Sequence, residues 1–201
     1  SWVVFESGPF GATYAHALGI RPHVDRANPI LALIGSPTEL TKLQSDRLES
    51  QSGVDLITVD DPASDVSQLL SRLRASAEIG KTVIGIRTTS RDGSAPDPLH
   101  ASQMLALIID LAVECADSMQ FDGIYASGGD VAFAVLDALG ARGYEAENEV
   151  VPLAVSGKLV GGPHDGLGFA TKGGLVGDAD AAVECINQLR SRIRQSEPRI
   201  V

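Results

Sequence analysis

Residues 122–140 have the sequence Asp-Gly-Ile-Tyr-Ala-Ser-Gly-Gly-Asp-Val-Ala-Phe-Ala-Val-Leu-Asp-Ala-Leu-Gly, which predicts a strand that ends on two glycines and leads directly into a helix. Gly128 and Gly129 lack a Cβ atom, so both can adopt a positive φ and let a ligand approach the backbone. The helix that follows adds unpaired N–H groups and the positive end of its dipole. Asp130 is expected at the N-cap, and Gly140 at the C′ position where the helix ends. This segment predicts a site for a phosphate or a nucleotide, with a plain tight turn as the alternative.

A second unit of strand, glycines and helix follows in residues 168–194. Its turn has the sequence Thr-Lys-Gly-Gly-Leu-Val-Gly-Asp over residues 171–178, and Asp178 is expected at the N-cap. Lys172 falls at the bend, and a lysine carries three donors and a mobile charge that suit a phosphate group. A solvent-exposed loop lysine is the alternative. Two such units in one small domain favour a nucleotide site.

Apolar segments alternate with amphipathic segments along the chain. Strands are expected at residues 30–34, 54–59, 82–87, 123–126 and 167–171. Helices are expected at residues 38–50, 63–79, 98–119, 131–139 and 179–194. The alternation predicts an α/β fold, a mostly parallel sheet flanked by helices on both sides, with an antiparallel edge extension at residues 145–161. A ligand is expected beyond the carboxyl ends of the strands, where both glycine turns fall.

The composition predicts a globular, cytoplasmic domain. Hydrophobic residues make up 44% of the chain, enough for a packed core. No stretch approaches the roughly 18 apolar residues of a membrane span, so no membrane partner is expected. The formal net charge of −10 argues against a nucleic-acid partner, which requires a basic face. This charge is compatible with ATP, because glycine turns, helix N-termini and Mg²⁺ supply local positive potential.

The cysteines and histidines do not form a metal-binding pattern. Cys115 and Cys185 lie in separate helical segments, and we expect buried free thiols in a reducing compartment. The polar segment 88–97 is expected to be a solvated connection, with a cover over the nucleotide as the alternative. The histidines have no partner at catalytic or metal spacing: His16, His23, His100 and His164.

Three segments together carry a resemblance to a known family. They are Ser-Gly-Gly-Asp at residues 127–130, the turn at residues 171–178, and Ile-Gly-Ser-Pro-Thr at residues 34–38, which is followed by Thr41 and Gln44. In this order they are similar to the nucleotide-binding domain of the four-carbon acid sugar kinases, long catalogued as a domain of unknown function. In that family a Gly-Ser segment ends the first strand, and a threonine and a glutamine follow in the next helix.

The resemblance, which covers residues 30–195, implies an activity. It implies ATP-dependent phosphorylation of a sugar acid of the threonate, erythronate or 3-oxo-tetronate type, with ATP and Mg²⁺ as cofactors. Lys172 would then act as the catalytic charge, because phosphoryl transfer depends mainly on positioning and charge neutralisation. Asp130 would cap its helix or hold Mg²⁺ indirectly. The residues expected to contact the nucleotide are Ser36, Ser127, Gly128, Gly129, Asp130, Gly173 and Gly174.

The chain also departs from the family pattern. Val131 replaces the usual threonine, Gly173 replaces the usual serine, and Leu175 and Val176 change the rest of the turn. Two hydroxyl groups are thereby lost, so a non-catalytic nucleotide-binding sensor or assembly module is the alternative function. A dinucleotide-dependent oxidoreductase is disfavoured, because no Gly-x-Gly-x-x-Gly follows the first strand.

The length of the chain adds an expectation about domains. The resemblance implies a protein of roughly twice this size, whereas 201 residues suit about one domain. We therefore expect residues 29–201 to form the nucleotide-binding domain, and residues 1–28 to be a lead-in from a missing N-terminal domain that binds the sugar acid. Such a fragment is expected to be inactive alone, and a homodimer is left open.

Overall fold

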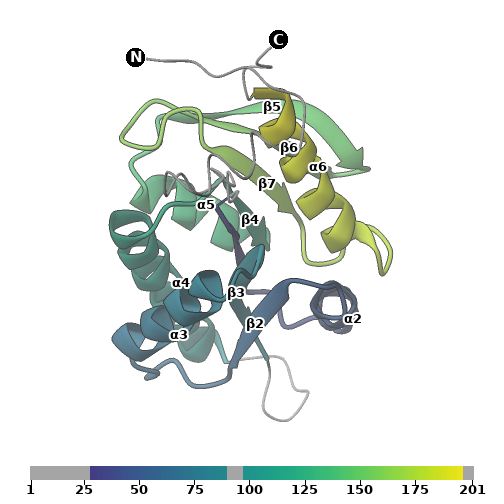
Figure 1. The fold of residues 1–201 in the computed structure, drawn as a ribbon. Coiled ribbons are helices and arrows are strands. Elements are labelled where there is room, and N and C mark those ends of the chain that lie inside the picture. The colour runs from purple at the N-terminus through teal and green to yellow at the C-terminus, as the bar shows by residue number, and fades with distance from the viewer. Residues whose placement is uncertain (1–27, 90–96, 197–201) are drawn as a thin grey trace, which may run out of the picture.

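The computed structural model describes residues 28–89 and 97–196, so nearly all of the expected lead-in lies outside the described residues, as do His16 and His23. Within these ranges the strands are β1 (Ile30–Ile34), β2 (Val54–Val59), β3 (Val83–Thr88), β4 (Gly123–Ser127), β5 (Gly143–Val151), β6 (Ala154–Val160) and β7 (Gly168–Lys172). They form one sheet in the order β2-β3-β1-β4-β7-β6-β5 (Figure 1). The first five strands in this order are parallel, and β6 and β5 are antiparallel. The predicted α/β class with an antiparallel edge is confirmed.

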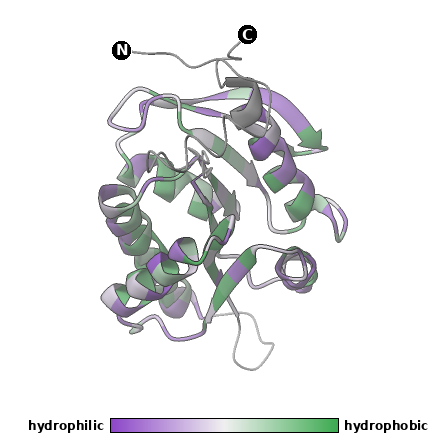
Figure 2. Ribbon diagram, viewed as in Figure 1, coloured by the Kyte–Doolittle hydropathy of each residue, from purple (hydrophilic) through white to green (hydrophobic). Residues whose placement is uncertain are grey.

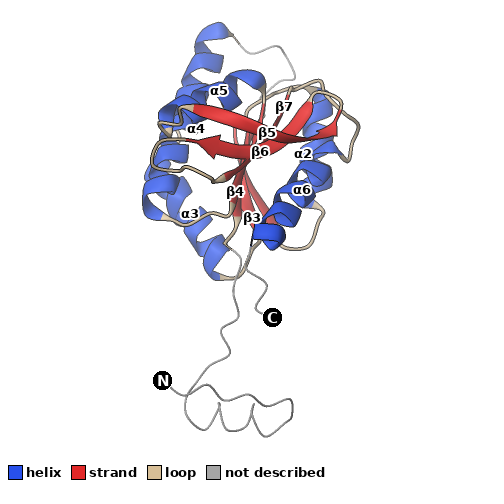
Figure 3. Ribbon diagram, turned by 90° about the horizontal axis from the view of Figure 1, so that it is seen from above, coloured by secondary structure: helices blue, strands red, loops and turns tan. Residues whose placement is uncertain are grey.

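Helices cover both faces of the sheet, as predicted. In the described ranges they are α2 (Glu39–Glu49), α3 (Val66–Glu78), α4 (Pro98–Ser118), α5 (Gly129–Ala138) and α6 (Ala181–Ser196). Figure 3 shows α3, α4 and α5 on one side of the sheet and α2 and α6 on the other. Each side has its own hydrophobic core. Leu111 of α4 and Val135 of α5 belong to one core, and Leu48 of α2 and Ile186 of α6 belong to the other.

The central strand β1 shows why the sequence produces two cores. Each of its residues is buried. Leu31 and Leu33 pack into the core beneath α3, α4 and α5, whereas Ile30, Ala32 and Ile34 pack into the core beneath α2 and α6. A strand buried on both faces requires apolar residues at every position. The chain places β2 and β3 on one side of β1 and then β4 and the later strands on the other side. The connections therefore leave the carboxyl end of β1 in opposite directions, and a crevice opens between them.

Helix α4 has the length and composition of a membrane-spanning helix. It contains 21 residues and is strongly hydrophobic (Figure 2). The expectation that no run approaches 18 apolar residues holds for this helix, because Asp110 and Glu114 interrupt its apolar sequence. Its buried residues form a stripe that includes Leu107, Leu111 and Cys115 and packs on the sheet, which is the pattern of a core helix. Cys115 and Cys185 are buried free thiols, as expected, and burial raises the pKa of Cys115 to about 12.

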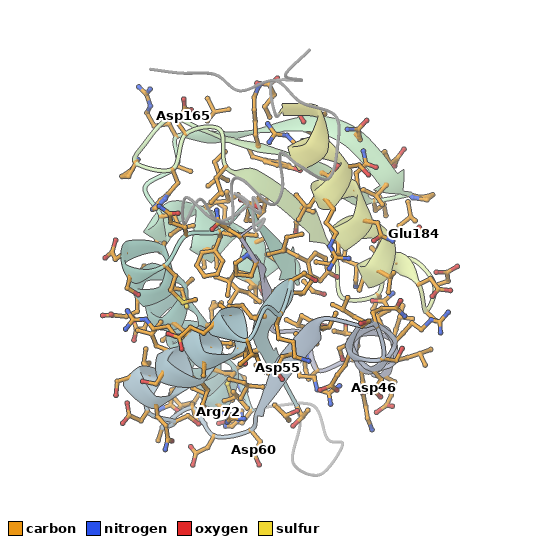
Figure 4. All side chains as sticks on the ribbon, in the orientation of Figure 1. Asp46, Asp55, Asp60, Arg72, Asp165 and Glu184 are labelled. Atoms are coloured by element: carbon orange, nitrogen blue, oxygen red, sulfur yellow. The ribbon has the colours of Figure 1, made fainter. Side chains whose placement is uncertain are left out.

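Charged side chains lie around the outside of the molecule, as the labelled Asp46, Asp165 and Glu184 illustrate (Figure 4). One group of ion pairs links α2 to the sheet, because Arg87 of β3 pairs with both Asp46 and Glu49. Exposed pairs of this kind contribute roughly 0–1 kcal/mol each. The two apolar cores therefore hold the fold together.

Candidate functional site

A large cavity opens at the carboxyl ends of the parallel strands, where the sequence predicts a ligand. Its volume is about 1060 Å³. The segments after β1, β3, β4 and β7 line it together with one side of α4. The predicted site residues in its wall are Ser36, Gly128, Gly129, Asp130, Gly173 and Gly174. Two further predicted residues, Ser127 and Lys172, are buried outside this wall.

Gly128 forms the turn between β4 and α5. Its φ of +112° lies in the region that favours glycine, and it is the N-cap of the helix. Its carbonyl oxygen accepts the first intrahelical hydrogen bond from the N–H of Ala132, at 2.9 Å. The N–H groups of Gly129, Asp130 and Val131 therefore have no partner within the helix. Together with the helix dipole, they give this wall of the cavity a positive end that suits an anion.

Two details of this turn differ from the sequence expectation. Gly129 is the first residue of α5 and does not have a positive φ. Asp130 is not the N-cap, because the turn is already complete at Gly128. It lies in the first turn of the helix, where its carboxylate complements the dipole. Gly140 follows the end of the helix with a φ of +67°, as predicted.

The second glycine turn differs from the expectation at both ends. Lys172 is the last residue of β7 and not part of the bend. Helix α6 begins at Ala181, so Asp178 is too early in the chain to be its N-cap. The carboxylate of Asp178 accepts a hydrogen bond from the N–H of Asp180 at 3.0 Å, which stabilises the turn before the helix.

The turn after β7 packs closely on the turn after β1 and on α2. A Cβ at Gly174 would clash with Oγ of Ser36, so only glycine fits there without a shift. Oγ1 of Thr38 and Oγ1 of Thr41 each lie 2.9 Å from the carbonyl oxygen of Gly174, to which they donate. The two hydroxyl oxygens are 3.0 Å apart. The start of α2 thus fixes the position of the glycine turn.

Gln44 forms hydrogen bonds to the second half of the same turn. Its Nε2 donates to the carbonyl oxygen of Val176 at 2.9 Å and to that of Asp178 at 2.6 Å. The side chains of Gln44 and Thr41 are both buried. The sequence singled out these two residues only by resemblance, and the structure gives them a physical role.

Lys172 lies behind the glycine turn. It pairs in register with Ser127, and it follows two residues after Ala170, so its side chain leaves the sheet on the side of α2 and α6. The side chain is 2% exposed, and Nζ donates to the carbonyl oxygen of Gly173 at 3.0 Å. In the described ranges no carboxylate pairs with this ammonium, and burial lowers its pKa. The alternative of an exposed loop lysine is therefore wrong.

Other buried polar groups share this side of the sheet. Oγ of Ser127, the hydroxyl of Tyr125 and Oε1 of Gln44 have no hydrogen-bond partner in the part of the chain that the structure describes. All three oxygens can accept a hydrogen bond, so they complement a lysine ammonium chemically. The sequence pointed to Ser127 and Gln44 separately, but it did not indicate Tyr125 or the common location of the three. The signal that could have found it is the strand period of two, which places Tyr125 and Ser127 on one face of β4.

Lys172→Met is expected to stabilise the domain at neutral pH, because methionine occupies similar space without a buried unpaired charge. In the wild-type protein the folded-state pKa of Lys172 lies below the ordinary 10.5, so the unfolded chain binds more protons between the two values. The stability of the wild type relative to the variant should therefore rise with pH through that window. Urea unfolding of both proteins at a series of pH values measures this difference.

The control for this prediction is Lys42→Met, which removes an exposed lysine on α2. It should change stability little at any pH. A stability difference between wild type and Lys172→Met that stays constant up to pH 10.5 would contradict a buried, charged lysine at this position.

The cavity also has an apolar wall, which the sequence analysis did not predict. Met104, Leu105 and Ile108 of α4 line it, and His100 lies near the start of the same helix. The sequence offered no reason to select His100 as a site residue, because no partner lies at catalytic or metal-binding spacing from it. Helix α4 nevertheless places it in the wall of the cavity. A pocket with one apolar wall and one glycine-rich wall suits a ligand that is apolar at one end and anionic at the other.

The polar segment 88–97 borders the same cavity. Thr88 and Thr89 at its start and Asp97 at its end line the wall. Residues 90–96 lie outside the described residues, so the choice between a solvated connection and a cover over the ligand stays a prediction.

Comparison with known sequences agrees with this geometry. A family model described as "Nucleotide-binding C-terminal domain" matches residues 31–182. The chain is 34% identical to a D-erythronate kinase from Heliobacterium modesticaldum over 219 residues, covering 96% of this chain and 49% of the relative. It is 27% identical to a D-threonate kinase from Salmonella typhimurium over 173 residues, covering 74% of this chain and 40% of the relative. The chain thus spans about half the length of these relatives or less.

Solved structures share the fold. One from Bordetella bronchiseptica, described as a domain of unknown function with bound citrate and as a domain-swapped dimer, matches with a TM-score of 0.70 and 26% identity. The match covers 82% of this chain and 41% of that one. A protein from Haemophilus influenzae matches with a TM-score of 0.66 over 88% of this chain and 45% of that one; its 16% identity shows a common fold alone.

Proposed function

The chain belongs to the family of nucleotide-binding C-terminal domains of the four-carbon acid sugar kinases, and from this premise we propose that it is the nucleotide-binding part of an ATP-dependent kinase that phosphorylates a four-carbon sugar acid. The observation that carries the proposal is the cavity at the carboxyl ends of the parallel strands, where two glycine turns meet the N-terminus of α5. The relatives named as D-erythronate and D-threonate kinases support an acceptor of this class.

The phosphate groups of ATP are assigned to the glycine-rich wall. The free N–H groups at the start of α5 and the positive end of its dipole favour negative charge there. Gly129, where a Cβ would meet nothing within 4 Å, leaves the backbone accessible, and Ser36 adds a hydroxyl group in the same wall. These groups suit phosphoryl transfer, in which the protein mainly positions the reactants and stabilises charge.

The base of the nucleotide is assigned to the apolar wall of α4. Met104, Leu105 and Ile108 present apolar surface to the cavity, and His100 lies one helical turn before Met104. A purine ring can bury its face against such a surface. The volume of about 1060 Å³ leaves ample room for a nucleoside triphosphate in this half of the protein.

Lys172 is proposed to supply catalytic charge from behind the glycine turn. Its Nζ contacts the carbonyl oxygen of Gly173, and Gly173 lines the cavity, so one peptide unit separates the ammonium from the ligand space. In the described ranges no carboxylate cancels this charge, so its field extends to the phosphates. Mg²⁺ binds mainly through phosphate oxygens and waters, which fits a wall with Asp130 as an indirect ligand, and it neutralises charge on the phosphates when bound.

The isolated chain is expected to bind Mg-ADP and Mg-ATP weakly and saturably. The walls assigned to the phosphates and the base are both present in this chain, whereas the relatives have about as many residues again outside the matched region. Isothermal titration calorimetry measures the affinity, and adenosine, which lacks the phosphates, serves as the comparison ligand. Absence of both heat and thermal shift at millimolar nucleotide would contradict the assignment of the cavity.

Kinase activity is tested on the full-length protein with a panel of four-carbon sugar acids. We expect ATP-dependent phosphorylation of at least one acid by the full-length protein and none by this chain alone. A non-catalytic nucleotide-binding module is the second candidate, and Val131 and Gly173 favour it because each replaces a hydroxyl residue of the family pattern. Nucleotide binding without turnover of any acid in the panel would support this second candidate.

A further inference from the structure

The glycine turn after β7 is held by its carbonyl groups, and this determines where its N–H groups point. The carbonyl oxygen of Gly174 accepts from the hydroxyls of Thr38 and Thr41, both on the side of α2. In a trans peptide unit the C=O and the following N–H point in opposite directions. The N–H of Leu175 is therefore directed away from α2.

This N–H group is free to bind a ligand. No donor bond from the N–H of Leu175 is formed within the part of the chain that the structure describes. Leu175 and Gly174 both line the cavity. A free backbone N–H in a glycine-rich turn is a common donor to phosphate oxygens. Since its side chain is apolar, Leu175 can offer an anion only its backbone.

We propose that Thr41 is a positioning residue that orients the peptide unit between Gly174 and Leu175, so that the N–H of Leu175 donates to a phosphate group of the bound nucleotide. This inference rests on the function proposed above and adds a specific contact to it. Without the hydroxyl of Thr41 the carbonyl oxygen of Gly174 keeps only its hydrogen bond from Thr38, so the peptide unit is held less firmly and its N–H is directed at the phosphate less of the time.

Thr41 is better suited to a test than its neighbour Thr38. Thr38 is also the N-cap of α2, because its Oγ1 accepts from the N–H of Thr41 at 3.2 Å. A change at Thr38 would therefore disturb the start of the helix as well. The hydroxyl of Thr41 is buried and makes its bonds toward Thr38 and Gly174, so its removal acts on the turn.

The experiment compares three variants by calorimetry with ADP and with adenosine. Thr41→Val keeps the shape of the side chain but loses the hydroxyl, and we expect a loss of roughly tenfold in affinity for ADP with affinity for adenosine unchanged. Thr41→Ser restores the hydroxyl and should restore the affinity for ADP. Ser45→Ala removes another buried hydroxyl of α2, which donates to Lys42 within the helix, and should have no effect.

Wild-type affinity for ADP in Thr41→Val would overturn the inference, and so would an equal loss of affinity for ADP and for adenosine. A second measurement does not depend on the folding of any variant. In ¹⁵N NMR spectra of the wild type, pyrophosphate should shift the amide resonance of Leu175. Shifts at Gly129 without a shift at Leu175 would refute the contact, whereas a wild type that binds neither ADP nor pyrophosphate would overturn the proposed function itself.

Discussion

Replacing Gly128 by alanine is expected to weaken nucleotide binding by about five- to hundredfold. Gly128 has a φ of +112° and a ψ of 130°, a conformation that alanine adopts only at a cost of order 1–3 kcal/mol. The alanine variant can avoid this strain by moving the turn, but the free N–H groups at the start of α5 then move away from the cavity. Calorimetry with ADP, together with urea unfolding, separates the loss of affinity from the loss of stability.

Gly129→Ala is the matched control for backbone strain. Gly129 is the first residue of α5, and a Cβ there meets nothing within 4 Å. This variant should keep the stability of the wild type or gain up to about 1 kcal/mol. Any loss of affinity in it would measure how closely the ligand approaches the backbone. If a folded Gly128→Ala variant binds ADP with wild-type affinity, the phosphate groups do not bind at this turn.

Lys172→Met in the full-length protein is expected to lower kcat by roughly a hundredfold or more, the size found for other single electrostatic donors. Negative charge moves toward the leaving oxygen as the phosphoryl group departs, so the ammonium should matter more in the transition state than in the ground state. The KM for ATP should therefore change less than kcat. Steady-state kinetics at varied ATP concentrations measure both constants.

The same variant has a second signature that separates catalysis from packing. At neutral pH we expect Lys172→Met to be at least as stable as the wild type, because a buried lysine without a carboxylate partner in the described ranges is replaced by an apolar side chain. A variant that loses activity and also stability would point to a structural role. A higher KM for ATP with an unchanged kcat would mean that the lysine only positions the nucleotide. If both kcat and KM equal those of the wild type, Lys172 has no role in the site.

The strands, the helices and the glycine turns could be predicted from the sequence because each depends on local properties. Buried parallel strands need continuous apolar runs, as in β1, and the turn at Gly128 needs a residue without a Cβ. The prediction was wrong at the end of β7, where one additional strand residue decides which face of the sheet a side chain occupies. The strand was expected to end at Thr171, with Lys172 at the bend, but β7 extends to Lys172. Because side chains in a strand alternate between faces, this places the lysine in the core beside α2 and α6.

The contacts between distant segments could not be predicted by the same reasoning. Gln44 reaches carbonyl groups more than 130 positions later in the chain, and no local pattern encodes that pairing. His100 joins the cavity only because α4 begins beside the carboxyl end of β3. The order of the strands creates these proximities, and the alternation of strands and helices in the sequence predicts a mostly parallel sheet but not the order of its strands.

The hydrogen bonds from α2 to the turn after β7 have a consequence for how sequences in this family diverge. Thr41 and Gln44 donate to main-chain carbonyl oxygens, which every amino acid carries. Replacing the side chains of Leu175 and Val176 therefore leaves these hydrogen bonds in place. We expect such positions to vary more freely than Gly174, where any Cβ would require Ser36 to shift. We therefore expect a search profile weighted on the threonine and glutamine of this helix to detect remote homologues that a profile weighted on the variable turn would miss.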